Sequence, residues 1–105
     1  MTMETKKNFR GEPIHQPEFL AKVEAARAVI VGRHVTVTSL SSGDTEQGSC
    51  TEIAIVPDYD SINVVLANGT RYGMEIGEVG ADSISGPTGA FSPGYSHRVV
   101  TVFTP

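Results

Sequence analysis

Residues 53–76, IAIVPDYDSINVVLANGTRYGMEI, decide the fold because they predict three consecutive strands. Ile53–Val56 is a short apolar run rich in β-branched side chains, and the polar turn Pro57–Ser61 ends it. Ile62–Leu66 continues as a strand whose apolar side chains recur at alternate positions. This order is typical of an antiparallel meander with one hydrophobic face.

A tight hairpin joins the second and third of these strands. Asn68-Gly69 predicts a type I′ turn, because both central residues of that turn need positive φ and these two residue types tolerate it best. The return strand places Tyr72, Met74 and Ile76 on one face. A three-stranded meander is not stable alone in water, so the rest of the chain must cover its apolar face.

Pro17–Val31 is the segment that predicts a helix. Proline suits the first helical position, where its missing N–H group costs nothing, and Gly32 is a natural C-terminal stop. Five apolar residues recur at helical spacing and predict one buried stripe: Phe19, Leu20, Val23, Ala26 and Ile30. We expect this stripe to pack on the meander.

Four further segments predict strands: Arg33–Leu40, Gln47–Val56 with a bend near Gly48, a short strand in Ala81–Ser85, and Arg98–Phe103. Five or six short, bent antiparallel strands tend to roll up and so remove exposed edges. The predicted fold is therefore mainly β, a small bent antiparallel β-barrel of Sm-like or SH3-like type with one N-terminal α-helix.

Length and charge restrict the domain organisation and the class of partner. With 105 residues, we expect a flexible N-terminal arm over 1–16 and a single helix-plus-barrel domain over 17–105. The net charge of −4 argues against a general nucleic-acid binder. The one cysteine excludes an intramolecular disulfide framework. The sequence has no apolar segment long enough to span a membrane and no secretory h-region, so we expect a cytoplasmic protein without membrane contact.

The segment Asp58–Leu66 resembles the first motif of the Sm-like family of small SH3-type barrels, in which an acidic turn precedes an apolar residue, an Asn and a hydrophobic strand. The resemblance extends over about residues 17–85 and implies an N-terminal helix and five bent strands. It also implies that Asn63 helps to hold an RNA base. The family's second motif, an Arg-Gly pair, is replaced here by Val79-Gly80. The arrangement is similar as well to that of Rof-like Rho inhibitors, which are acidic, non-catalytic and act through protein contact.

The candidate binding residues fall into two further groups. Asp44, Glu46, Asp58 and Asp60 lie in two turns and predict an acidic rim for a basic partner. Residues 86–96 form a Gly/Pro-rich connection, and Phe91, Tyr95, His97 and Arg98 in and after it could stack a base or bind an anion. The three histidines and the one cysteine show no metal-ligand spacing, so we expect no metal, no cofactor and no catalytic residues.

These observations favour a non-enzymatic binding module that acts through protein contact, as an inhibitor or adaptor, and that self-associates as a homo-oligomer. Two alternatives remain open at this point. One is an Sm-like RNA-binding ring that uses Asn63, and the other is an oligomeric binder or sponge of a nucleotide-like small ligand that uses the loop before Arg98. The small regulatory domain is typical of a phage or bacterial accessory protein.

Overall fold

The computed structural model describes residue 7 and residues 11–40, 42–88 and 97–103. The helix α1 (Pro17–Ile30) comes first, and the strands follow it. They are β1 (His34–Ser39), β2 (Thr45–Ile55), β3 (Ile62–Leu66), β4 (Arg71–Met74), β5 (Glu78–Val79), β6 (Ser83–Pro87) and β7 (His97–Val102). The prediction of a mainly β fold with one N-terminal helix is confirmed.

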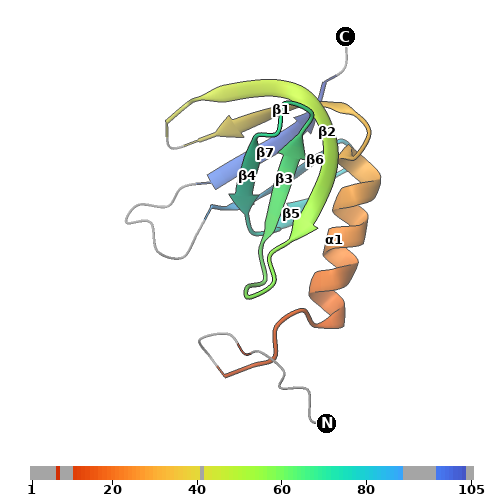
Figure 1. Cartoon of the computed structure of the whole chain (residues 1–105), viewed down its shortest axis with the longest axis vertical. Coiled ribbons are helices and arrows are strands. Elements are labelled where there is room, and N and C mark those ends of the chain that lie inside the picture. Colours follow the sequence, from red (N-terminus) through yellow and green to blue (C-terminus); the bar gives the residue numbers. More distant parts are fainter. Residues whose placement is uncertain (1–6, 8–10, 41, 89–96, 104–105) are drawn as a thin grey trace.

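The seven strands form one antiparallel sheet in the order β4-β3-β2-β1-β7-β6-β5, and the sheet bends strongly around α1 and the core (Figure 1). Seven strands are one more than the upper end of the predicted five or six, and the strand that the sequence missed is β5, which has only two residues. The sheet is not a closed barrel, since β4 and β5 are the two ends of the strand order. The chain just after β4 nevertheless bonds to β6, from the N–H of Glu75 to Pro87 O (2.8 Å) and from the N–H of Gly77 to Ser85 O (2.7 Å).

The hairpin between β3 and β4 is present, but the predicted type I′ turn is wrong, because Gly69 has positive φ (89°) and Asn68 does not. The N–H of Gly69 donates to Leu66 O at 2.9 Å, so Ala67 and Asn68 are the central residues of the turn, and the N–H of Leu66 donates to Thr70 O at 2.9 Å to begin the β3–β4 ladder. Gly32 has φ of 84° and follows α1 as the predicted stop. The bend expected near Gly48 lies slightly later, as a register shift between Cys50 and Glu52 in the β2–β3 ladder.

That register shift is a β-bulge, and it lets one long strand serve two ladders. From Thr45 to Ser49, β2 pairs with β1, and from Cys50 onward it pairs with β3 across the bulge. Thr51 and Glu52 are both exposed, while Cys50 and Ile53 are both buried. A regular strand turns successive side chains to opposite faces, so Cys50 and Ile53, which are three positions apart, could not both point inward in it. The bulge lets both do so, because Thr51 and Glu52 together take one outward position.

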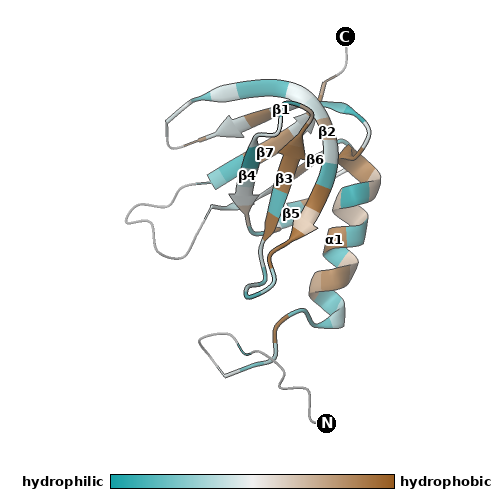
Figure 2. Ribbon diagram, in the orientation of Figure 1, coloured by the Kyte–Doolittle hydropathy of each residue, from teal (hydrophilic) through white to brown (hydrophobic). Residues whose placement is uncertain are grey.

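The core lies between α1 and the inner face of the bent sheet, and Figure 2 shows the apolar residues concentrated in β3, in the end of β2 and on α1. Its buried members are Val23, Ala26, Ile30, Val35, Val37, Cys50, Ile53, Ile62, Val64, Leu66, Met74, Ile76, Ile84 and Val100. The predicted helical stripe is wrong at Leu20, which is 40% exposed, because the contacts of α1 with the core are made by Phe19, Val23, Ala26, Val29 and Ile30 instead.

The segment before the helix is bound to the turn between β2 and β3. The backbone N–H of His15 donates to Asp60 Oδ1 at 2.7 Å, and His15 Nε2 lies 3.0 Å from Val56 O and 2.9 Å from Tyr59 O. The His15 ring stacks on Phe19, with 5.5 Å between ring centroids. The residues expected to form a flexible arm are in part outside the described residues, and His15 is the one that makes these contacts.

Candidate functional site

The predicted binding residues do not form one site. Phe91 and Tyr95 lie outside the described residues. Asp58 and Asp60 lie in the turn between β2 and β3, where Asp60 is occupied by the N–H of His15. His97 and Arg98 begin β7, and their side chains point to opposite faces of the sheet because they are adjacent in a strand.

Asn63 lies on the outer face of the sheet. It is half-buried in β3 and stands between Ala54 of β2 and Gly73 of β4 in the strand register. Arg98 is on the inner face, because it alternates with the buried Val100. A single ligand-binding pocket therefore does not contain both of these side chains.

Arg98 instead belongs to an open cleft at the polar end of the core, with a volume of about 490 Å³. The cleft forms because the inner faces of four strands change from apolar to polar at the same end. Its lining residues are Val37 and Ser39 of β1, Asp44, Thr45 and Glu46 at the start of β2, Tyr72 of β4 and Arg98 of β7. On β1, β4 and β7, a polar residue of the inner face lies two positions from a buried apolar one, such as Arg98 beside Val100.

The Arg98 guanidinium spans this cleft from β1 to β4. Nη1 donates to the carbonyl oxygen of Gly73 at 2.6 Å, and Nε and Nη2 donate to Ser39 Oγ at 3.4 and 3.3 Å. The guanidinium carbon also lies 5.1 Å from the centre of the Tyr72 ring, which is cation–π distance. Three strands therefore fix the position of this one charged group.

The guanidinium keeps binding capacity. It has five N–H donors, and the bonds to Gly73 and Ser39 use three of them. Among the described residues, no carboxylate forms an ion pair with Arg98. Partial burial lowers the pKa of the guanidinium below its ordinary value, yet an arginine remains charged at neutral pH. The cleft thus offers a fixed positive charge with two N–H groups that no described residue uses.

A negative charge occupies another part of the same cleft. Glu46 is half-exposed, and its Oε1 accepts a hydrogen bond from Asn68 Nδ2 at 2.9 Å. Asp44 lies beside it on the rim and is exposed. Because Asn68 belongs to the turn before β4, Glu46 is close to the beginning of β4, whereas Arg98 is bound to Gly73 near its end.

The edge of β4 borders the cleft. In an antiparallel ladder, every second residue of a strand bonds to the neighbouring strand. The bond from Leu66 to Thr70 shows which residues of β3 and β4 bond to each other. Tyr72 and Met74 therefore bond to β3, and the backbone groups of Arg71 and Gly73 point to the opposite edge. Among the described residues, the Gly73 carbonyl takes the Arg98 bond and the other outward groups of these two residues have no backbone partner.

The described residues offer little other chemistry. In that part of the chain, no three His, Cys, Asp or Glu side chains are grouped so that they could hold a metal ion. Cys50 is buried, and burial raises the pKa of its thiol, an effect that a hydrogen bond with the backbone of Glu52 partly opposes. No helix in the described ranges is long and apolar enough to cross a membrane.

Tyr72 and Ser39 are cleft residues that the sequence did not single out for binding, whereas Asp44 and Glu46 belong to the predicted acidic rim. Tyr72 was predicted only as an inner-face residue, which it is. A usable signal existed in the sequence, because β1 and β7 each end their apolar alternation with a polar residue on the inner face: Ser39 after Val37, and Arg98 before Val100.

Comparison with known proteins adds no relative, since no family model, no curated protein and no solved structure matches this chain.

Proposed function

We propose that this chain is a non-enzymatic binding module that acts through contact with a protein partner, and that an extended segment of the partner binds in the cleft of Tyr72 and Arg98. The observation that carries this proposal is the Arg98 guanidinium, which three strands hold in an open cleft and which keeps two N–H donors without a partner among the described residues. An acidic group of the partner is the natural acceptor for these donors.

The edge of β4 supports a polypeptide as the bound molecule. The outward backbone groups of Arg71 and Gly73 are the donors and acceptors with which an added strand pairs, and this mode of recognition takes extended peptides. A module of this kind serves as an inhibitor or adaptor, because it captures a segment without changing it chemically.

The charge of the cleft favours a protein over the two alternatives. Asp44 and Glu46 line the same cleft as Arg98, and the whole chain has a net charge of −4. An RNA strand or a nucleotide brings closely spaced phosphates, which these carboxylates repel. A protein segment can instead offer one acidic group to Arg98 and avoid the rim.

Selection from a random peptide library tests this proposal. The full-length protein and its Arg98→Gln variant are used as baits in parallel, and we expect enrichment of peptides on the wild type that is lost on the variant. In the same protein samples, thermal melting is followed with oligo(U), oligo(A) and a set of nucleotides, where we expect no shift.

Two results would overturn the proposal: a nucleic acid or nucleotide that raises the melting temperature through Arg98, or a selection whose peptides ignore Arg98. Light scattering on the free protein adds the mass in solution. A mass above that of the 11.2 kDa monomer identifies a second copy of the chain as one of the partners that the protein binds.

A further inference from the structure

The cleft has a direction along β4, because its two charges are fixed at opposite ends of that strand. At the beginning of β4, Glu46 is bound to Asn68 of the preceding turn. Near its end, Arg98 is bound to the carbonyl of Gly73. A segment that lies along β4 therefore passes a negative charge first and a positive charge afterwards, read in the direction of the β4 chain.

A strand added to this edge brings its own side chains to the cleft in a fixed pattern. Alternate residues of a strand point to the same face, and two such residues are about 7 Å apart. Long side chains at positions i and i+2 can therefore reach both charged ends of a strand as short as β4, which covers Arg71–Met74. Antiparallel pairing is the more stable arrangement of an added strand.

We infer that the cleft recognises an extended segment with the pattern Glu-x-Lys, or its equivalents with Asp or Arg, paired antiparallel to β4. In that direction the acidic residue lies opposite Tyr72 and points to the inner face of the sheet, as Tyr72 does, so its carboxylate accepts the two remaining N–H groups of Arg98. The basic residue, two positions later, lies opposite Thr70 on the same face, near Glu46, which is bound to Asn68. This inference rests on the proposed function and names the chemistry of the partner.

The backbone allows this pairing without breaking the Arg98 bond. The carbonyl oxygen of Gly73 has two lone pairs, so it can accept an N–H of the added strand while it keeps Arg98 Nη1. Gly73 is exposed and has no side chain that would obstruct the approach of a second backbone. The Tyr72 ring lies beneath the guanidinium and limits its movement, so the acceptor position is defined in advance.

The charge pattern also excludes other segments. A segment with two acidic residues places one of them against Glu46 and Asp44, and a segment with two basic residues places one against Arg98. Like charges at such positions are unfavourable, so the cleft discriminates by repulsion as well as by attraction.

The test uses four fluorescein-labelled ten-residue peptides in one Thr/Ser/Val host sequence, which differ only in a central triplet: Glu-Thr-Lys, Lys-Thr-Glu, Glu-Thr-Glu and Lys-Thr-Lys. Fluorescence anisotropy with the full-length protein gives the four dissociation constants. We expect Glu-Thr-Lys to bind about tenfold more tightly or better than each of the others, since hydrogen bonds to charged groups contribute that much. In ¹⁵N-labelled wild-type protein, its addition should shift the amide signals of Arg71 and Gly73.

Two cleft variants and one control make the assignment residue by residue. Arg98→Gln should weaken Glu-Thr-Lys about tenfold but change little for a Gln-Thr-Lys peptide, and Glu46→Gln should weaken Glu-Thr-Lys while it changes little for Glu-Thr-Gln. Arg33→Gln removes an exposed arginine outside the cleft and should leave all affinities within about twofold of the wild type. If Arg98→Gln does not fold, the affinities of Glu46→Gln and the amide shifts of the wild type decide whether the peptide binds in this cleft in the inferred direction.

The outcomes separate this inference from the proposed function. If Glu-Thr-Glu or Lys-Thr-Glu binds as well as Glu-Thr-Lys and the binding depends on Arg98, the pattern is wrong and the protein-contact function stands. If peptides selected from the library bind through Arg98 but share no acidic and basic pair, the pattern is wrong in the same way. If no peptide binds through Arg98, both proposals are overturned.

Discussion

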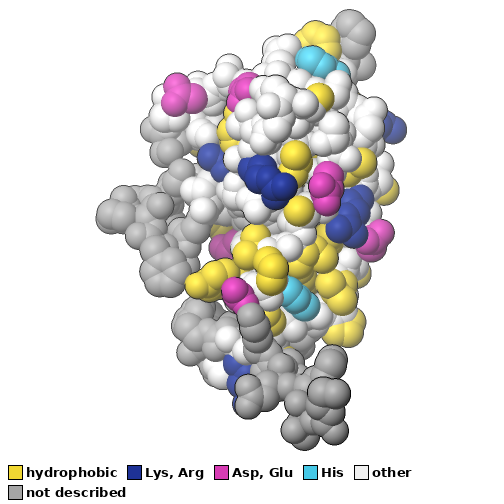
Figure 3. All heavy atoms as spheres, in the orientation of Figure 1, with side chains coloured by type: hydrophobic (Ala, Val, Ile, Leu, Met, Phe, Trp, Pro, Cys, Tyr) yellow, Lys and Arg dark blue, Asp and Glu magenta, His cyan; other side chains and the backbone are white. Residues whose placement is uncertain are grey.

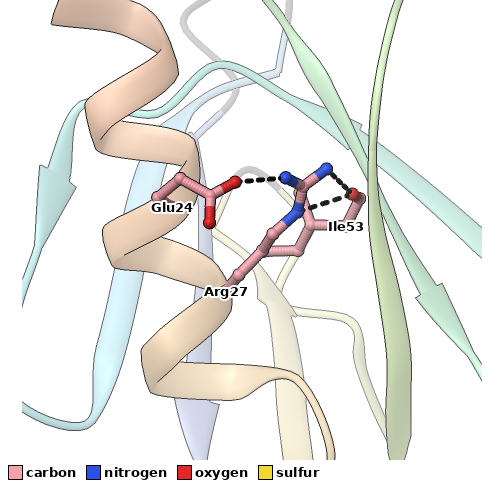
Figure 4. Close-up of polar contacts among 3 residues, drawn as sticks. All are labelled: Glu24, Arg27 and Ile53. Atoms are coloured by element: carbon pink, nitrogen blue, oxygen red, sulfur yellow. Dashed lines mark hydrogen bonds and ion pairs between the residues drawn. The ribbon is translucent and has the colours of Figure 1, made fainter.

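Arg27 of α1 donates two N–H groups to one carbonyl oxygen, that of Ile53 in β2, at 3.3 Å from Nε and 2.9 Å from Nη2 (Figure 4). The N–H of Val56 donates to Ser61 O, and in an antiparallel ladder every second residue of a strand bonds to its neighbour. Ala54 therefore bonds to β3, and the Ile53 carbonyl points away from β3. Gly73 in β4 is in the same situation, and its carbonyl is bound by Arg98. Two arginines thus each satisfy a carbonyl that a strand leaves outside its ladder.

The Arg27 bond predicts a cost for its removal. Arg27→Met keeps most of the aliphatic stem but leaves the partly buried Ile53 carbonyl without its donors, so we expect a loss of about 1–2 kcal/mol in the free energy of unfolding. Urea denaturation followed by circular dichroism measures this loss. Glu24→Gln is the matched control, because it removes only the exposed ion pair with Arg27 and should cost under about 0.5 kcal/mol. Equal losses in the two variants would contradict this interpretation.

Gly86 in β6 predicts the most damaging small substitution. A Cβ atom at this position would lie 1.8 Å from the carbonyl oxygen of Glu75, which is backbone and cannot rotate away. We expect Gly86→Ala to separate β6 from the chain after β4 and to cost more than about 3 kcal/mol, a large share of the stability of a small domain. Gly73→Ala is the control, since its Cβ would meet Asn63 Oδ1 at an ordinary 3.5 Å.

Thermal melting of the two alanine variants checks this expectation. The Gly73→Ala protein should melt within a few degrees of the wild type, and the Gly86→Ala protein should be largely unfolded or melt far lower. A Gly86→Ala protein with wild-type stability would show that the two strands can move apart without loss.

His15 combines an unusual backbone with a set of side-chain contacts. Its φ of 56° is in the left-handed region, which costs a non-glycine residue about 1 kcal/mol, and the ring contacts Val56 O, Tyr59 O and Phe19. We expect His15→Ala to lose the contacts and keep the strain, and His15→Gly to lose the contacts and the strain. His15→Gly should therefore be the more stable variant by about 1 kcal/mol.

Urea denaturation of these two proteins measures the difference directly, and the wild type gives the value of the ring contacts. The reverse order, with alanine the more stable, would mean that the backbone of residue 15 is not held at positive φ in solution.

Figure 3 shows hydrophobic side chains gathered where the start of α1 and the turn after β2 lie, and exposed Tyr59 belongs to that turn.

Cys50 predicts a dependence of stability on pH. Burial raises the pKa of its thiol in the folded state, so the folded chain binds the thiol proton more tightly than the unfolded chain does. This contribution to stability is fully present below the unfolded-state pKa of about 8.5 and is lost as pH rises above it. The free energy of unfolding should therefore fall more steeply above this pH in the wild type than in Cys50→Ala.

Urea denaturation at a series of pH values between about 7 and 10 compares the two proteins, whose other titrating groups are the same. The difference between their free energies of unfolding should shrink as the pH rises. Parallel curves would show that the thiol ionises as readily in the folded chain as in the unfolded one.

Local patterns in the sequence predicted the elements well. The helix was expected over Pro17–Val31 and is found over Pro17–Ile30, and a hairpin is found at Asn68-Gly69, although only Gly69 has the positive φ that the predicted type I′ turn required at both residues. These features depend on residues that are neighbours in the chain, so periodicity and turn chemistry suffice to find them.

The cleft could not be predicted in the same way, because it depends on which strands become neighbours. Tyr72 and Arg98 are far apart in sequence, and they meet only because β7 pairs with β1 while the chain after β4 bonds to β6. The sequence did mark Arg98 as a binding residue, but it grouped Arg98 with His97, whose side chain is on the other face. The alternation of faces along a strand, applied to that segment, would have separated them.

The bulge at Thr51 has a consequence for how this chain can vary in length. Because Thr51 and Glu52 together take the place of one outward-facing residue, deletion of Thr51 would leave Cys50 and Ile53 two positions apart, and a regular strand would still turn both of them inward. A deletion within Ile53–Ile55 would instead turn the residues on one side of it to the opposite face of the sheet. Descendants of this sequence should therefore be able to lose the bulge through Thr51 or Glu52, while the number of residues from Ile53 to Ile55 stays constant.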